Sequence, residues 1–289
     1  MAQHIAIYGK GGVGKSTLAA NLSAALAEIG KRVVLVGCDP KSDSATLLHS
    51  GEQRPSVIDH IAAGKRISLD RLVTTGYRGI STIEMGDPFQ TGECASHGLT
   101  KAFELLHELD ALGRLNPDVV LYDIPGDHGC AGFASLISTS LVRQFLLVTS
   151  ADVMSLYTAN NIFRMIDRQR AGNLVAGALI ANGLNGPFEE SLVDDFARQV
   201  NSRVIGNIAR SLVVKQCELY GKTVIEAAPL SNHAYVYRRL ARHIVDDKVI
   251  ASLPVPRPLP VSALKQWART WGDRICELET GIIRDGGGI

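Results

Sequence analysis

Runs of apolar residues alternate along the chain with segments whose apolar positions repeat at helical spacing. The apolar runs are not interrupted by alternating polar residues, which is typical of strands buried on both faces of a sheet. The runs that predict strands are His4–Tyr8, Arg32–Gly37, the weaker Gly79–Met85, Asp118–Tyr122, Arg143–Ser150, Leu174–Asn182 and the short Arg203–Gly206. The segments that predict helices are Lys15–Ile29, Ser56–Ala63, Gly98–Leu112, Ser155–Ala171, Glu189–Val200 and Ser231–Asp247.

This alternation of strands and helices predicts an α/β fold with a mostly parallel sheet and helices on both faces. No internal repeat or linker divides the chain, so we expect a single domain over residues 1–279. The proline-rich segment Val255–Val261 is expected to run extended over the surface. Residues 280–289 end in a glycine-rich stretch and are expected to form a flexible tail.

Composition narrows the classes of function. The chain has 289 residues, of which 46% are hydrophobic and only 6% aromatic, so a large core of Ala, Val, Leu and Ile is available. The 30 basic and 29 acidic residues give a net charge of +1, which does not favour a nucleic-acid partner. Apolar runs stay well below the roughly 18 residues typical of a membrane span. The first strand begins without a signal segment, so a cytoplasmic protein with no membrane partner is expected.

The segment between the first predicted strand and the first predicted helix reads GKGGVGKST. Gly9, Gly14, Lys15 and Ser16 fit the spacing of a phosphate-binding loop, and the strand before it and helix after it are the required context. Glycines let backbone N–H groups turn toward phosphates, Lys15 reaches the outer phosphates, and the Ser16 hydroxyl can hold Mg²⁺. The candidate nucleotide-binding residues of this loop are Gly9, Lys10, Gly11, Gly12, Val13, Gly14, Lys15, Ser16 and Thr17.

Acidic residues follow two of the predicted strands. Asp39 and Asp43 lie in GCDPKSD after the second strand, and Asp123 and Asp127 lie in YDIPGD after the strand that begins at Asp118. Ligands of open α/β sheets sit at the carboxyl ends of the strands, so these carboxylates are candidates for binding Mg²⁺ and sensing the terminal phosphate. The alternative is that they are ordinary turn carboxylates.

Two of the five cysteines lie in short glycine-rich loops. Cys94 is in TGECASHG and Cys130 in GDHGCAGF, and each precedes an apolar helical segment, which favours the thiolate form. Two thiolates are too few for an iron–sulfur cluster that needs four, but a symmetric dimer supplies four on its twofold axis. The alternative is a pair of unrelated core thiols. Cys38, Cys217 and Cys276 are interpreted as structural.

Taken together, AIYGKGGVGKST, VGCDPKSD, GECASHG and YDIPGDHGCAGF resemble the nitrogenase iron protein family, and the similarity continues to LPVPRPLPVSALKQW near the C-terminus. The resemblance implies a homodimer that bridges one [4Fe–4S] cluster, binds one Mg-ATP per subunit and delivers electrons to a separate nitrogenase-like catalytic component. It further implies ferredoxin or flavodoxin as the electron donor.

Position by position, the resemblance assigns Cys94 and Cys130 as cluster ligands. It assigns Ser16, Asp39 and Asp123 to Mg²⁺, and Asp39 to Asp43, with Lys41 between them, to a first switch loop. Asp123 to Asp127 match the second switch, and Asn182 and Glu218 match positions that contact the nucleoside. Lys10 is expected to reach the nucleotide of the partner subunit. Lys10, Asp39 and Asp127 are the candidate catalytic residues. The alternative for Lys10 is a solvated loop lysine.

The sequence departs from the nitrogenase pattern at two single positions and in the second switch, which reads DIPGDHG instead of the usual leucine-centred form. His97 stands where nitrogenase iron proteins carry an arginine, and Ser211 stands in place of an aspartate. These departures favour a nitrogenase-like reductase, such as that of methylthio-alkane reductase or of a nickel-tetrapyrrole cyclase, over nitrogenase itself. Two other classes share the phosphate loop: partition-type positioning ATPases, and cluster scaffolds, which usually carry a late Cys-x-x-Cys pair that this sequence does not have.

Overall fold

The computed structural model describes residues 2–64, 67–87, 95–126, 142, 144–169 and 176–281. Within these residues a central sheet has eight strands in the order β3-β4-β2-β5-β1-β6-β7-β8. Its strands are β1 Gln3–Gly9, β2 Val33–Gly37, β3 Thr74–Thr75, β4 Ser81–Glu84, β5 Val119–Asp123, β6 Gln144–Thr149, β7 Ala176–Leu184 and β8 Val204–Ala209. Neighbouring strands run parallel except β3, which pairs antiparallel with β4 at one edge. The predicted single α/β domain is confirmed.

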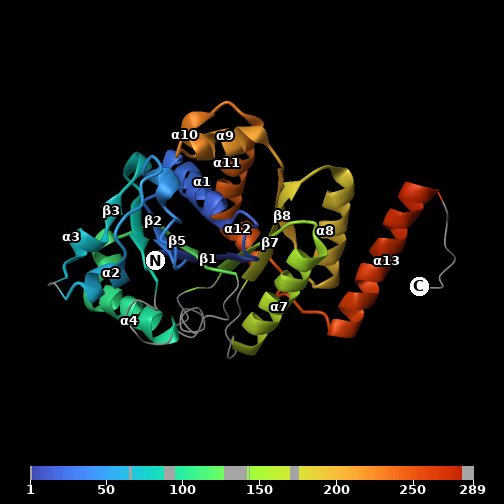
Figure 1. Cartoon of the computed structure of the whole chain (residues 1–289), viewed down its shortest axis with the longest axis horizontal. Coiled ribbons are helices and arrows are strands. Elements are labelled where there is room, and N and C mark those ends of the chain that lie inside the picture. The colour runs from blue at the N-terminus through green and yellow to red at the C-terminus, as the bar shows by residue number, and fades with distance from the viewer. Residues whose placement is uncertain are drawn as a thin grey trace.

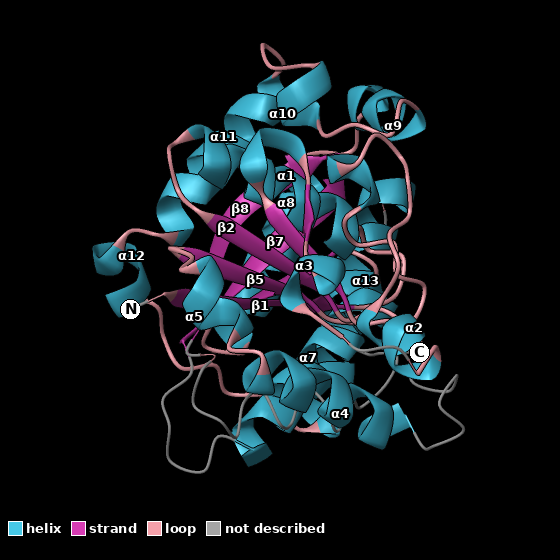
Figure 2. Cartoon of the chain, turned by 90° about the vertical axis from the view of Figure 1, so that its left-hand side faces the viewer, coloured by secondary structure: helices cyan, strands magenta, loops and turns pink. Residues whose placement is uncertain are grey.

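Helices cover both faces of this sheet (Figures 1 and 2). One face packs against α1 Lys15–Glu28, α9 Leu212–Leu219, α10 Val224–Ala227 and α11 Asn232–Ile244. The other packs against α2 Val57–Ala62, α3 Leu69–Leu72, α4 Ala95–Glu108, α7 Val153–Gln169 and α8 Pro187–Gln199. Along β1 the side chains of Ile5 and Ile7 enter the first layer and those of Ala6 and Tyr8 the second, which explains why the strand is apolar throughout.

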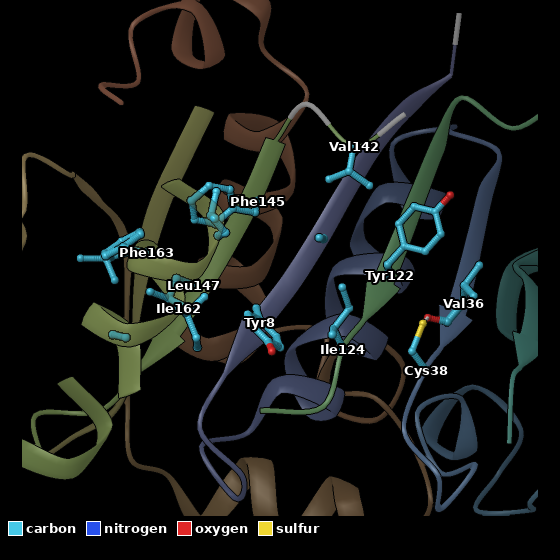
Figure 3. Close-up of a cluster of buried hydrophobic side chains, with 14 of the residues drawn as sticks. Tyr8, Val36, Cys38, Tyr122, Ile124, Val142, Phe145, Leu147, Ile162 and Phe163 are labelled. Carbon is cyan, nitrogen blue, oxygen red and sulfur yellow. Dashed lines mark hydrogen bonds between the residues drawn. The ribbon is translucent and has the colours of Figure 1, made fainter. Parts of the chain in front are cut away.

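Figure 3 shows part of the second layer, in which Tyr8, Tyr122 and Phe145 of neighbouring strands lie over the same face. Cys38 belongs to this cluster, one residue beyond the end of β2, and only 4% of its surface is exposed. Cys217 of α9 is buried in the opposite layer, and Cys276 is partly exposed. None of these three thiols shares a disulfide.

Several predicted elements differ from the structure at their ends. The helix expected over Gly98–Leu112 breaks after α4, because Asp110 adopts a left-handed conformation with φ of 48°, and a short α5 spans Ala111–Leu115. The helix expected to end at Asp247 stops at Ile244 instead. There Asp246 accepts a hydrogen bond from the Lys248 N–H at 2.9 Å and so caps a new helix, α12 Asp247–Ala251. Strand β8 runs three residues beyond the predicted Gly206.

The C-terminal helix α13 Val261–Thr280 follows the extended connector. Asp195 of α8 holds it, because one carboxylate oxygen, Oδ2, accepts hydrogen bonds from the indole N–H groups of Trp267 at 2.8 Å and Trp271 at 2.9 Å. The connector itself is fixed by the Leu259 carbonyl, which accepts hydrogen bonds from Asn160 and Arg164 of α7. Of the predicted tail, only Thr280 and Gly281 lie within the described residues.

Candidate functional site

The phosphate-loop sequence forms the tight turn between β1 and α1. Gly9, Gly12 and Gly14 all have positive φ, at 154°, 76° and 92°, a conformation that side chains rarely adopt. Space is also restricted: a Cβ on Gly9 would overlap the Val148 carbonyl of β6, and one on Gly14 would overlap the Asn182 amide of β7. These glycines let the backbone N–H groups face inward at the N-terminus of α1, where the helix dipole favours anions.

Two side chains brace the loop from inside. Lys15 is 7% exposed, and its ammonium group donates a hydrogen bond to the Lys10 carbonyl at 3.1 Å, which curls the loop around it. The Asn182 Nδ2 donates to the Val13 carbonyl at 2.7 Å. The side chain of Lys10 is half-buried. Asn182, predicted to contact the nucleoside, is therefore in direct contact with the phosphate loop, although 169 positions separate it from Val13.

Carboxylates gather beside the loop at the carboxyl end of the sheet. Asp123 ends β5, is 1% exposed, and neither of its oxygens receives a well-formed hydrogen bond from the described residues. Burial raises its pKa, and the nearby hydroxyls of Ser16 and Ser44 and the charge of Lys15 offset part of that rise. Burial and the charge of Asp39 likewise raise the pKa of Asp43. One buried and two half-buried carboxylates that repel one another call for a cation.

These residues fit Mg²⁺ bound together with a nucleotide. No set of three or more His, Cys, Asp or Glu side chains forms a closed metal site among the described residues. Mg²⁺ is ordinarily held by one or two carboxylates together with phosphate oxygens and water, so an incomplete protein shell is what such a site requires. Asp123, Asp39 and the Ser16 hydroxyl are the residues that would hold the ion beside the phosphate loop.

The first predicted switch loop lies next to this group. The Asp39 carboxylate accepts a hydrogen bond from the Lys41 N–H at 3.0 Å, and the Asp43 carbonyl accepts one from the Thr46 hydroxyl at 2.9 Å. The loop is thus held mainly by its own short-range contacts, and Lys41 points to solvent. Such contacts leave the loop free to rearrange when a terminal phosphate and its metal ion enter or leave.

A cavity of about 430 Å³ opens from the phosphate loop along the carboxyl ends of β6, β7 and β8. Both predicted nucleoside contacts, Asn182 and Glu218, line it, and Glu218 accepts a hydrogen bond from the Thr17 hydroxyl at 2.5 Å. The cavity volume and its polar rim suit a nucleoside. Ser211 also lines the cavity, and its hydroxyl caps α9 by accepting a hydrogen bond from the Val213 N–H at 3.1 Å.

Other residues that line this cavity were not among the predicted nucleotide contacts. Asp152 follows β6, Arg210 follows β8, and Lys215 and Tyr237 come from helices α9 and α11. The rule that ligands gather at strand carboxyl ends applies to Asp152 and Arg210 as well and was a usable signal for both. Lys215 and Tyr237 reach the cavity from helices, and no sequence motif marked them.

Three predicted site residues lie outside the described part of the chain. These are Asp127 of the second switch and the proposed cluster ligands Cys94 and Cys130. The described chain reaches to within a few residues of each of them. Strand β4 leads toward Cys94, β5 leads toward Asp127 and Cys130, and α4 begins at Ala95. Gly126 packs so tightly on the phosphate loop that a Cβ there would overlap the Gly9 carbonyl.

Comparison with known proteins connects this nucleotide site to a redox family. A family model described as 4Fe-4S iron sulfur cluster binding proteins, NifH/frxC family, matches residues 3–273. The chain belongs to this family. It is 41% identical over 282 residues to nitrogenase iron protein 2 of Paenibacillus durus, which covers 97% of this chain and 96% of the relative. It is also 41% identical to a nitrogenase iron protein of Methanospirillum hungatei, with coverage of 93% and 96%.

Solved structures with the same fold come from other phosphate-loop ATPases. A cell division ATPase MinD of Pyrococcus furiosus superposes with a TM-score of 0.65 at 18% identity, covering 84% of this chain and 98% of that one. A ParA family ATPase of Chlorobium tepidum gives a TM-score of 0.67, also at 18% identity, with coverage of 84% and 100%. At this identity the likeness shows the fold alone. The iron-protein family itself binds a [4Fe–4S] cluster and uses Mg-ATP.

No helix in the described part of the chain combines the length and the apolar character needed to cross a bilayer.

A pH dependence follows from a second buried acid beside the site. Glu84, at the end of β4, is 3% exposed, and burial, reinforced by the charges of Asp123, Asp43 and Asp39, raises its pKa to about 8. The folded chain therefore binds the Glu84 proton more tightly than the unfolded chain, whose glutamate has a pKa of 4.5. That contribution to stability is fully present below the unfolded value and is lost as pH rises through the folded value.

We therefore expect the free energy of unfolding to fall more steeply in wild type than in Glu84→Gln between about pH 5 and about pH 8. Glutamine keeps the shape of the protonated acid but does not ionise, so the difference between the two profiles isolates Glu84. Urea unfolding of the nucleotide-free protein at a series of pH values measures it. Profiles that stay parallel over this window would contradict a neutral Glu84.

Proposed function

We propose that this protein is an ATP-dependent electron-transfer reductase: a homodimer that bridges one [4Fe–4S] cluster and couples Mg-ATP hydrolysis to electron delivery. The observation that carries the proposal is the position of Asp123. Its buried carboxylate ends β5 beside the phosphate loop, and the chain runs from it to Cys130 in seven residues. A change at the metal and phosphates therefore has a short covalent path to a proposed cluster ligand.

The nucleotide half of the reaction rests on described residues. Loop N–H groups, Lys15 and the α1 dipole hold the phosphates of ATP, and Ser16, Asp39 and Asp123 hold Mg²⁺. Asn182 and Glu218 place the nucleoside in the adjoining cavity. Asp127, as the residue of the second switch, is proposed to orient the attacking water. A bound Mg²⁺ would supply the positive charge that Asp39 and Asp123 lack, and these two residues would connect the two switch loops to the phosphate site.

The redox half rests on family membership and on the chemistry of the cysteines. Cys94 and Cys130 from each of two subunits supply the four thiolates that a [4Fe–4S] cluster needs. When bound, this cluster supplies a one-electron carrier at the subunit interface. Relatives of the nitrogenase iron protein family work as homodimers that deliver electrons to a catalytic component.

For the catalytic partner we infer a nitrogenase-like component, with methylthio-alkane reductase as the specific candidate and ferredoxin or flavodoxin as the donor. The departures at His97 and Ser211 support this over nitrogenase itself. Transfer of electrons from the reduced, ATP-loaded protein to each purified component distinguishes them. Turnover with nitrogenase and none with methylthio-alkane reductase would contradict the inference.

The cluster proposal predicts about four irons per dimer in protein purified without oxygen, because each subunit contributes two of four ligands. Iron analysis and electron paramagnetic resonance measure this. Cys94→Ser and Cys130→Ser should each lose the cluster, whereas Cys276→Ser, a thiol on α13, is the matched control and should keep it. A full cluster in either of the first two variants would refute the assignment.

Lys10 is proposed to act on the nucleotide of the partner subunit, as an arginine finger does. A mixed dimer tests this, with Lys10→Ala in one subunit and Lys15→Ala in the other. If Lys10 acts in trans, one site is intact and the other lacks both lysines, so about half of the wild-type ATPase activity should remain. If Lys10 acts in cis, both sites are damaged.

The control dimer carries both substitutions in one subunit. The trans arrangement then damages both sites, whereas a cis arrangement leaves one intact. Activity that is higher in this control than in the first dimer would show that Lys10 serves its own subunit.

A further inference from the structure

We propose that Glu84 is a positioning residue that ties the first switch loop to the strand leading to Cys94. This inference rests on the proposed function, because it gives the nucleotide site a second mechanical path to the cluster. The path through Asp123 reaches Cys130, and the path through Glu84 reaches the other ligand. Glu84 belongs to neither the phosphate loop nor the switch motifs, and the nucleotide mechanism above does not use it.

The first observation is a hydrogen bond between two segments that are far apart in the sequence. The Glu84 Oε1 accepts from the backbone N–H of Ala45 at 2.7 Å. Ala45 lies two residues after Asp43, where the first switch loop ends, and both Ala45 and Glu84 are buried, at 3% exposed each. A buried N–H without a partner is costly, so this bond holds the C-terminal end of the switch loop against β4.

The second observation is that β2 has no side chain at Gly37, which leaves room for the Glu84 carboxyl group. Gly37 of β2 is paired with Glu84 of β4 on one side and with Asp123 of β5 on the other. A Cβ on Gly37 would overlap the Glu84 Oε2 and crowd the Ser44 Cβ, at 2.7 Å. The missing side chain leaves the space in which the Glu84 carboxyl group lies across β2, between the switch loop and the sheet.

The third observation is a group of buried polar atoms that lack hydrogen bonds among the described residues. The Glu84 Oε2, the Ser44 Oγ and both Asp123 oxygens belong to it, and all three residues are at most 3% exposed. Buried polar atoms without partners are costly, and a bound ion is one way in which such atoms are satisfied. Ser44 also lies near enough to Asp123 to affect its pKa, so the group connects Glu84 with the proposed metal ligand.

The end of β4 transmits the position of Glu84 onward. The Met85 N–H donates to the Gly37 carbonyl at 2.8 Å, and the Met85 carbonyl accepts from the Ile58 N–H at 3.1 Å. The chain then continues through Gly86 and Asp87 toward Cys94, ten residues after Glu84. A shift of the switch loop on nucleotide binding would pass through the Ala45–Glu84 bond to the end of β4, the strand that precedes Cys94 in the sequence. Mg-ATP thereby favours one of two positions of the same element.

Hydrogen–deuterium exchange of the anaerobically purified dimer tests the proposal with Mg²⁺ and either ADP or a non-hydrolysable ATP analogue. In wild type, the peptides covering residues 44–48 and 81–87 should change protection together when ADP is replaced by the analogue. This comparison needs no variant. A change confined to the peptide covering residues 44–48 would overturn the proposal.

Glu84→Met and Glu84→Gln form a matched pair, because both keep the length of the side chain and only glutamine keeps an acceptor for Ala45. Methionine should speed exchange of the peptide covering residues 44–48 roughly tenfold and abolish the nucleotide response of residues 81–87. Glutamine should keep both the slow exchange and the nucleotide response of wild type. Ile83→Val controls for general weakening of β4. Ile83 lies on the same strand, but its side chain points to the opposite face of the sheet from the Glu84 carboxyl group.

Two results with these variants would overturn the proposal. One is a wild-type nucleotide response in Glu84→Met. The other is a response lost equally in Glu84→Gln and Ile83→Val. Because exchange at these peptides is measured whether or not iron is bound, failure of this inference is distinguishable from failure of the cluster proposal, which iron analysis reports separately.

Discussion

The buried carboxylate of Asp123 is the constraint on which the account depends. A carboxyl group that is 1% exposed and receives no well-formed hydrogen bond from the described residues is costly to ionise unless a cation joins it. The sheet places that carboxylate at the end of β5, next to the strand that carries the phosphate loop. We propose that this energetic cost favours the binding of Mg²⁺ and nucleotide. The chain after Asp123 leads to Cys130, a proposed cluster ligand.

The sheet order explains why three separate segments meet at this point. Strands β4, β2, β5 and β1 lie side by side and end at the same edge, so Glu84, Gly37, Asp123 and Ile7 are neighbours across the sheet. The two cysteine loops are continuations of β4 and β5, while the phosphate loop continues β1. We propose that this common edge of parallel strands brings the nucleotide site and the two cysteine segments together.

The sequence predicted the strands of this sheet well because their apolar runs reflect burial on both faces. It missed β3, whose two residues form an antiparallel edge with no hydrophobic run, and the break before α5, which depends on one left-handed aspartate. The phosphate loop was predictable because its glycines are required by backbone geometry. Lys215 and Tyr237 were not, since they reach the nucleoside cavity through the packing of helices. Glu84 appeared as an ordinary strand residue because its importance comes from the absent side chain at Gly37.

The central claim is that nucleotide state reaches the cluster through the chain after Asp123. The rate at which an iron chelator removes the cluster tests it most directly, measured without nucleotide, with Mg-ADP and with Mg-ATP. The account predicts different rates with Mg-ADP and Mg-ATP, and a smaller difference in Asp127→Asn, which weakens the second switch. Equal rates under all three conditions, in protein that carries a full cluster, would contradict it.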